Sequence, residues 1–149
     1  MRTQFCAVVA LLLALTGAGR TALAQGCAKS DFEAVVNAAG AALRDLKQQN
    51  LPQFQAKLHQ LKDKRNWSND EFPKQVETLV RDDKAAGYDK TSEELVARIS
   101  GGSGQPESDS AAPNCTLLTG LQADLKLLVE AQQAKWTHML AKVDGELAK

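Results

Sequence analysis

Apolar residues recur at steps of three and four along most of the chain, which is the spacing of amphipathic helices. The pattern predicts helices over residues 30–50, 52–66 and 116–148, with a break before Pro52 because proline suits the first turn of a helix. Strand-like alternation of β-branched and aromatic residues is absent. We therefore expect an all-α domain, folded as an antiparallel bundle of four to five helices.

Two predicted helix starts carry the spacing of a capping box, in which a hydroxyl and a carboxylate three residues apart bind each other's backbone amides. The pairs are Ser30 with Glu33 and Ser68 with Glu71. Trp67 and Phe72 flank the second pair at the positions of a hydrophobic staple. From there, the pattern allows one bent helix over residues 70–100, or a break at Gly87 and a new cap at Asp89 or Thr91.

The first 24 residues follow a different pattern. Arg2 precedes an almost unbroken apolar run over residues 5–15, and Ala22 and Ala24 form a small-residue cleavage site before Gln25. This layout is typical of a secretory signal peptide. We expect residues 1–24 to be removed by cleavage after Ala24, and the mature protein to be secreted into the periplasm.

The remaining chain, residues 25–149, has the length of a single domain. Residues 101–114 are rich in Gly, Ser and Pro and predict a flexible linker. The mature chain carries 16 basic and 18 acidic side chains, and this near-neutral balance argues against nucleic acid as a partner. No mature segment approaches the roughly 18 apolar residues of a membrane span, so we expect a protein that is not membrane-embedded.

Cleavage removes Cys6 and leaves Cys27 and Cys115 as the only pair in an oxidising compartment, which predicts one disulfide. Free thiols, an intermolecular bridge or a lipid anchor at Cys27 are the alternatives. Closure of a loop of roughly 90 residues stabilises a fold by about 4–5 kcal/mol. The bridge would make the first and last helices start at the same end and run parallel. Five alternating helices satisfy this, as do four with a linker that runs back along the bundle.

Residues with catalytic or ligand-binding chemistry are sparse. His59 and His138 are the only histidines, and two histidines on facing helices are one way for a bundle to carry haem or a metal. The sequence has no Gly-x-Ser-x-Gly motif. Acid pairs such as Asp82-Asp83 fit solvated faces or helix starts. We therefore expect no enzymatic activity, cofactor or metal, with a haem or metal carrier as the alternative.

One short motif carries a resemblance. Leu118, Thr119 and Gln122 spell Leu-Thr-x-x-Gln, which resembles the signature of small periplasmic stress chaperones, although those proteins carry it twice. The alternative is another capping box, made by Thr119 and Gln122. The mature chain also resembles uncharacterised secreted α-helical proteins of alphaproteobacteria. The resemblance to the stress chaperones implies a helical protein that binds unfolded envelope proteins or modulates envelope stress sensing, whereas the second resemblance implies no activity.

An apolar face is the remaining candidate for binding. Phe54, Trp67, Trp136 and Met139 are its expected members, and a protein partner or an apolar peptide is the expected ligand. The last predicted helix rises roughly 50 Å and the first only about 30 Å. The resulting overhang would allow a dimer.

Overall fold

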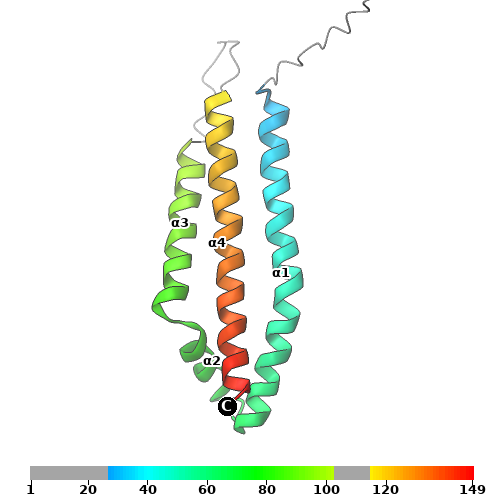
Figure 1. The fold of residues 1–149 in the computed structure, drawn as a ribbon, viewed down its shortest axis with the longest axis vertical. Coiled ribbons are helices and arrows are strands. Elements are labelled where there is room, and N and C mark those ends of the chain that lie inside the picture. Colours follow the sequence, from blue (N-terminus) through cyan, green and yellow to red (C-terminus); the bar gives the residue numbers. More distant parts are fainter. Residues whose placement is uncertain (1–26, 103–114) are drawn as a thin grey trace, which may run out of the picture.

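The computed structural model describes residues 27–102 and 115–149 and folds them into four helices without a strand. The helices are α1 (Lys29–Arg65), α2 (Phe72–Val80), α3 (Asp83–Gly102) and α4 (Cys115–Leu147). The three long helices lie side by side with α4 in the middle (Figure 1). The all-α bundle is therefore confirmed. The expected signal peptide and residues 103–114 of the expected linker lie outside the described residues, whereas Gly101 and Gly102 belong to α3.

α1 is one helix of 37 residues, so the break expected before Pro52 is wrong. Proline has no amide hydrogen, which leaves the Gln48 carbonyl without its usual helical donor and normally ends or bends a helix. Nearby, the Asn50 side chain donates a hydrogen bond of 2.7 Å to the Leu46 carbonyl. Leu46 and Leu58, on either side of the proline, are both buried, and α1 packs on α4. Burial of this continuous face offsets the missing hydrogen bond.

The continuity of α1 also removes the expected overhang of the last helix. At 37 and 33 residues, α1 and α4 rise about 55 and 50 Å. The two helices therefore match in length. The overhang that allowed a dimer in the sequence analysis is absent, so a dimer needs another basis.

A disulfide joins Cys27, just before α1, to Cys115, the first residue of α4. The two Cα atoms are 5.1 Å apart across a sequence separation of 88 residues. As predicted, the first and last helices start at the same end and run parallel, with α3 antiparallel to both (Figure 1). Because α2 is too short to traverse the bundle, α3 alone makes the return. Neither five alternating helices nor a linker running back along the bundle is needed.

The segment over residues 70–100 forms two helices, which meet at Arg81 and Asp82 rather than at Gly87. One oxygen of the Asp82 carboxylate accepts a hydrogen bond from the Ala85 amide at 2.8 Å, which caps the start of α3. The caps expected at Asp89 and Thr91 are wrong, because both residues lie inside α3.

The capping box before α2 is formed as expected. The Ser68 amide donates to a Glu71 carboxylate oxygen at 2.9 Å, and the Glu71 amide donates to the Ser68 hydroxyl at 3.2 Å. The hydrogen bond from the Ser68 amide, followed by one from the Ser68 side chain, lowers the pKa of the Glu71 carboxyl. The turn therefore fixes where the chain leaves α1 and enters α2.

The capping box expected at the start of α1 is not formed. The helix begins at Lys29, so Ser30 already lies inside it. The Ala28 amide instead donates to the Asp31 carboxylate at 2.9 Å. The cap and its acid therefore lie two residues earlier than the sequence indicated, and the cap residue has no hydroxyl.

The lower end of the bundle holds a compact core centred on Leu58, Leu61 and Val143. The side chains of Leu61 and Val143 are fully buried. Half-buried apolar side chains from α1, α2, α4 and the turn before α2 surround this core: Phe54, Trp67, Phe72, Val76, Leu79 and Leu147. Both residues of the expected staple therefore pack against the same cluster.

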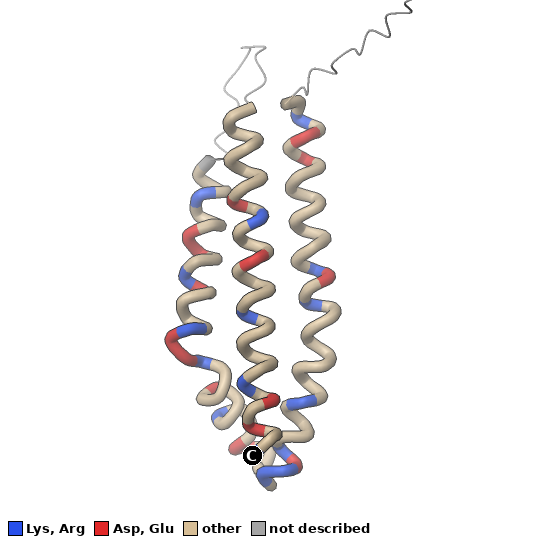
Figure 2. The backbone as a smooth tube through the Cα atoms, viewed as in Figure 1, with Lys and Arg blue, Asp and Glu red and all other residues tan. Residues whose placement is uncertain are grey.

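Charge is unevenly distributed over the helices. Charged residues are frequent along α3, at the lower end and at the very start of α1, whereas the next stretch of α1 and the upper part of α4 carry few (Figure 2). Residues 34–43 and 115–123 contain no charged side chain. Even so, none of the helices in the described ranges is long and apolar enough to cross a bilayer.

Candidate functional site

An apolar groove runs between α1 and α3, with α4 as its floor. α1 and α3 each pack on α4, but they make no extensive contact with each other. The groove has a volume of about 650 Å³. Its apolar lining comes from all three long helices: Leu43 and Leu46 of α1, Val96 and Ala97 of α3, and Leu128 and Trp136 of α4.

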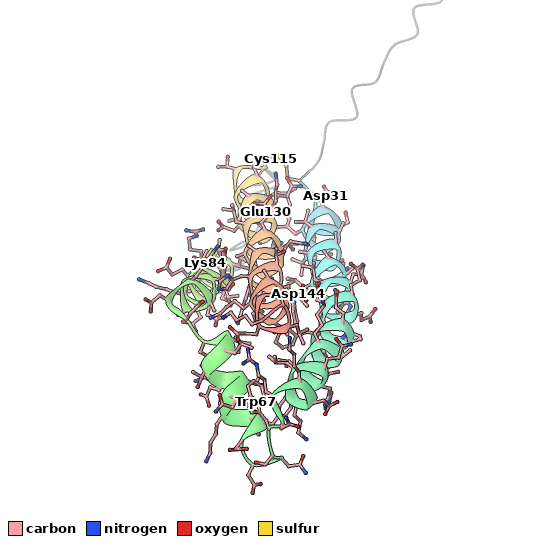
Figure 3. All side chains as sticks on the ribbon, turned by 60° about the horizontal axis from the view of Figure 1, so that its bottom comes forward. Asp31, Trp67, Lys84, Cys115, Glu130 and Asp144 are labelled. Atoms are coloured by element: carbon pink, nitrogen blue, oxygen red, sulfur yellow. A yellow bond between two sulfur atoms is a disulfide. The ribbon has the colours of Figure 1, made fainter. Side chains whose placement is uncertain are left out.

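The groove continues toward the face of the bundle that α2 covers. On α4, Leu128, Trp136 and Val143 follow steps of eight and seven residues and so share one helix face. The ring of Trp136 meets the ring of Phe54 edge to face at 5.9 Å. Phe54 in turn packs against the lower core that α2 covers. In Figure 3, α2 is displaced from the row formed by α3, α4 and α1.

Polar residues lie at the floor and the rims of the groove. Gln132 donates to the Ser92 hydroxyl at 2.8 Å, and this hydroxyl donates to the Tyr88 carbonyl at 2.9 Å. No buried side-chain polar atom in the described residues lacks a hydrogen-bond partner. Lys47 on the α1 side and Glu93 on the α3 side add one charge of each sign.

The four residues of the expected apolar face do not form one open patch. Phe54 and Trp67 are half-buried against the lower core, whereas Trp136 lines the groove. Met139 is half-buried on α4, one turn below Trp136. Trp136 therefore links the lower core to the groove. Leu43 and Val96 could not be predicted as groove residues, because in the sequence each is one more apolar position on a helix.

The strongest polar cluster joins the start of α3 to α4. Asp82 binds the His138 imidazole at 2.9 Å and the Lys142 ammonium at 2.8 Å, in addition to capping α3. The hydrogen bond from Lys142, then those from the Ala85 amide and His138, hold the pKa of Asp82 well below its usual range. Asp82 is 56 residues from His138, so sequence reasoning identified it only as a helix-start charge.

Further polar contacts follow the same interface upward and fix α3 on α4. Lys135 of α4 binds the carboxylate of Asp89. Arg98 of α3 binds Asp124 at 2.9 Å. Because α3 forms one wall of the groove, the contacts that fix α3 on α4 also set the width of the groove.

The two histidines occupy different interfaces. His59 stacks on Phe72 of α2 with ring centroids 5.6 Å apart, whereas His138 binds Asp82 and lies beside Tyr88. Among the residues that the structure describes, no group of three or more His, Cys, Asp or Glu side chains is arranged to hold a metal ion. The positions of the two histidines therefore give no support to the alternative of a haem or metal carrier.

The Leu-Thr-x-x-Gln motif lies in the first turns of α4. The Thr119 hydroxyl donates to the Cys115 carbonyl at 2.9 Å, and α4 already begins at Cys115. The alternative interpretation of Thr119 and Gln122 as a capping box is therefore wrong. Gln122 lines a second, shallower depression of about 430 Å³ between α1 and α4.

Comparison of the chain with known protein families, curated proteins and solved structures finds no match. The resemblance to periplasmic stress chaperones stays a prediction from the motif alone. The groove is therefore the main structural indication of a function in this protein.

Proposed function

We propose that this protein is a non-enzymatic periplasmic binding protein, which holds apolar segments of unfolded envelope proteins in the groove between α1 and α3. The observation that carries the proposal is the groove itself. Its volume of about 650 Å³ lies within the range of ligand sites, roughly 300–1,000 Å³. The disulfide is compatible with an oxidising compartment such as the periplasm.

The lining of the groove favours an apolar polypeptide over a small polar ligand. Its walls include Val96, which remains 48% exposed, and the half-buried Leu43, whereas Leu128 of the floor is buried. Exposed apolar side chains of this kind can be covered by the apolar side chains of a bound polypeptide. The floor residues Ser92 and Gln132 bind each other, so they present few groups for polar recognition.

The Asp82 cluster supports a structural role rather than catalysis. A catalytic acid or base needs access to a reacting group. Here Asp82 is bound at once by the Ala85 amide, His138 and Lys142, and it caps α3. These contacts hold α3 on α4, and this structural role explains why the three side chains lie together. No specific observation favours a haem or metal carrier built on His59 and His138.

The test is suppression of aggregation when a denaturant-unfolded client is diluted into buffer without reductant, so that the disulfide stays intact. We expect the protein to suppress aggregation, and Val96→Glu to abolish the effect by placing a charge in the groove. Leu127→Glu is the matched control, because Leu127 is also 48% exposed but lines neither depression. Equal activity of the two variants, or none in the parent protein at stoichiometric excess, would refute the proposal.

A further inference from the structure

We infer that the segment held in the groove is an amphipathic helix, which lies on α4 above α2 and carries acidic residues on one flank and basic residues on the other. This inference rests on the proposed function and specifies its ligand. It follows from three features of the described residues: the way α2 packs, the chemistry of the groove walls, and the charges at the rims.

α2 is a model for the ligand within the chain itself. It packs on the lower core through Phe72, Val76 and Leu79, an i, i+4, i+7 pattern. Three residues at this spacing rise about 10 Å along a helix. The groove floor from Leu128 to Trp136 rises about 12 Å. The floor therefore accommodates the same repeat of three apolar side chains.

The walls favour a helix over an extended segment. A buried backbone amide or carbonyl needs a hydrogen-bond partner. All three walls are helices, whose backbone groups bond within themselves, and the groove has no strand edge to pair with. Ser92 and Gln132 at the floor already bind each other. An occupant must therefore satisfy its own backbone, as a helix does.

The rims set the charge pattern of the ligand. Lys47 stands on the α1 side and Glu93 on the α3 side, and neither forms an ion pair among the described residues. A helix with one acidic and one basic flank can lie in the groove in either of two directions. In one of them its acidic flank lies beside Lys47 and its basic flank beside Glu93. A helix with two acidic flanks meets Glu93 in either direction, and one with two basic flanks meets Lys47 in either direction.

The experiment uses three synthetic helical peptides that share one apolar face and differ only in their flanks: mixed, both acidic, or both basic. Binding to the oxidised protein is measured by fluorescence anisotropy at low ionic strength, and helix formation by circular dichroism. We expect the mixed peptide to bind about fivefold more tightly than either other peptide, the size of one favourable rim contact. Val96→Glu should abolish binding of all three.

Two rim variants test the assignment of charges. Glu93→Lys should make the doubly acidic peptide the tightest binder, and Lys47→Glu should do the same for the doubly basic peptide. Arg44→Glu is the matched control, because Arg44 lies on α1 three residues from Lys47 but does not line the groove. If the order of the three peptide affinities stayed the same in both rim variants, or if it changed in Arg44→Glu, the inferred charge pattern of the ligand would be wrong.

The outcomes separate this inference from the proposed function. If a proline-containing peptide that cannot form a helix binds as tightly as the helical one, the inference fails while groove binding stands. If no peptide binds and Val96→Glu leaves aggregation suppression unchanged, both fail. If sedimentation shows self-association that Val96→Glu abolishes, the groove holds a second copy of the chain and the inference is overturned.

Discussion

At the scale of single residues, the lower core depends on a few fully buried side chains. Leu61 is completely buried among Leu58, Val143 and the residues of α2. Leu61→Ala removes apolar contacts and leaves a cavity, so we expect the free energy of unfolding to fall by about 2–5 kcal/mol. Urea denaturation measures the change. Leu127→Ala, at a half-exposed position, should change it by less than about 1 kcal/mol.

The Asp82 carboxylate makes a pH-dependent contribution to stability. Its pKa is lower in the folded chain than the ordinary value of 3.8, because Lys142, the Ala85 amide and His138 stabilise the ionised form. This stabilisation is complete above the unfolded pKa and disappears as the pH falls through the folded one. We expect Asp82→Asn to destabilise the protein at pH 7, and the difference from the parent protein to shrink below about pH 4.

Asparagine is the informative replacement because its side-chain oxygen still caps a helix, so only the charge is removed. Urea denaturation at a series of pH values measures the effect. Asp83→Asn is the control: Asp83 carries the same charge at the same helix start, but it is exposed. If both variants gave the same pH dependence, the contribution would come from the helix dipole and not from the tie to α4.

At the scale of elements, α1 tolerates a proline in its interior. Replacing Pro52 by alanine restores an amide donor for the Gln48 carbonyl and removes the ring that crowds the preceding turn. Pro52 is exposed, so the change leaves the α4 interface intact. We expect Pro52→Ala to stabilise the protein by about 1–3 kcal/mol, after allowance for the looser unfolded chain. A loss of stability in urea denaturation would show that α1 needs a proline bend to follow α4.

The helices themselves were predictable from spacing, but their ends were not. The apolar stripes identified the faces of α1 and α4, and the Ser68–Glu71 box located the turn before α2. The helix break predicted at Pro52 was wrong, because the packing of α1 on α4 outweighs the local tendency of proline to end a helix. The break between α2 and α3 was not predicted. It lies at Asp82, which caps α3 and is one of two adjacent acids, and its partners on α4 are distant in sequence.

The candidate site was predictable only in part. Trp136 was expected on a binding face and lines the groove, but Phe54 and Trp67 pack against the lower core. A sequence shows which residues are apolar on one helix. It does not show that α2 is short enough to leave the upper part of α4 uncovered between α1 and α3. That property depends on how three helices meet.

At the scale of the whole molecule, the two ends of the α1–α4 pair are held by different means. At the lower end, α1 binds α4 through Lys57 with Asp144 and through Arg65 with Glu146 at 3.0 Å. At the upper end, the Cys27–Cys115 disulfide joins the two helix starts. Because the helices are parallel, the positive ends of their dipoles lie together there, and the covalent bond holds them against this repulsion.

We therefore expect loss of the disulfide to open the molecule from the top. Replacing Cys27 and Cys115 by serine should lower the free energy of unfolding by about 4–5 kcal/mol, the value of a closed loop of this length. Hydrogen exchange should accelerate first in the opening turns of α1 and α4, while amides near Leu61 keep their relative protection. The reduced parent protein should match the serine variant, because both lack the same bond. Uniform acceleration along both helices would instead mean that the bundle unfolds as one unit, and unchanged stability would mean that the bond contributes nothing to the folded state.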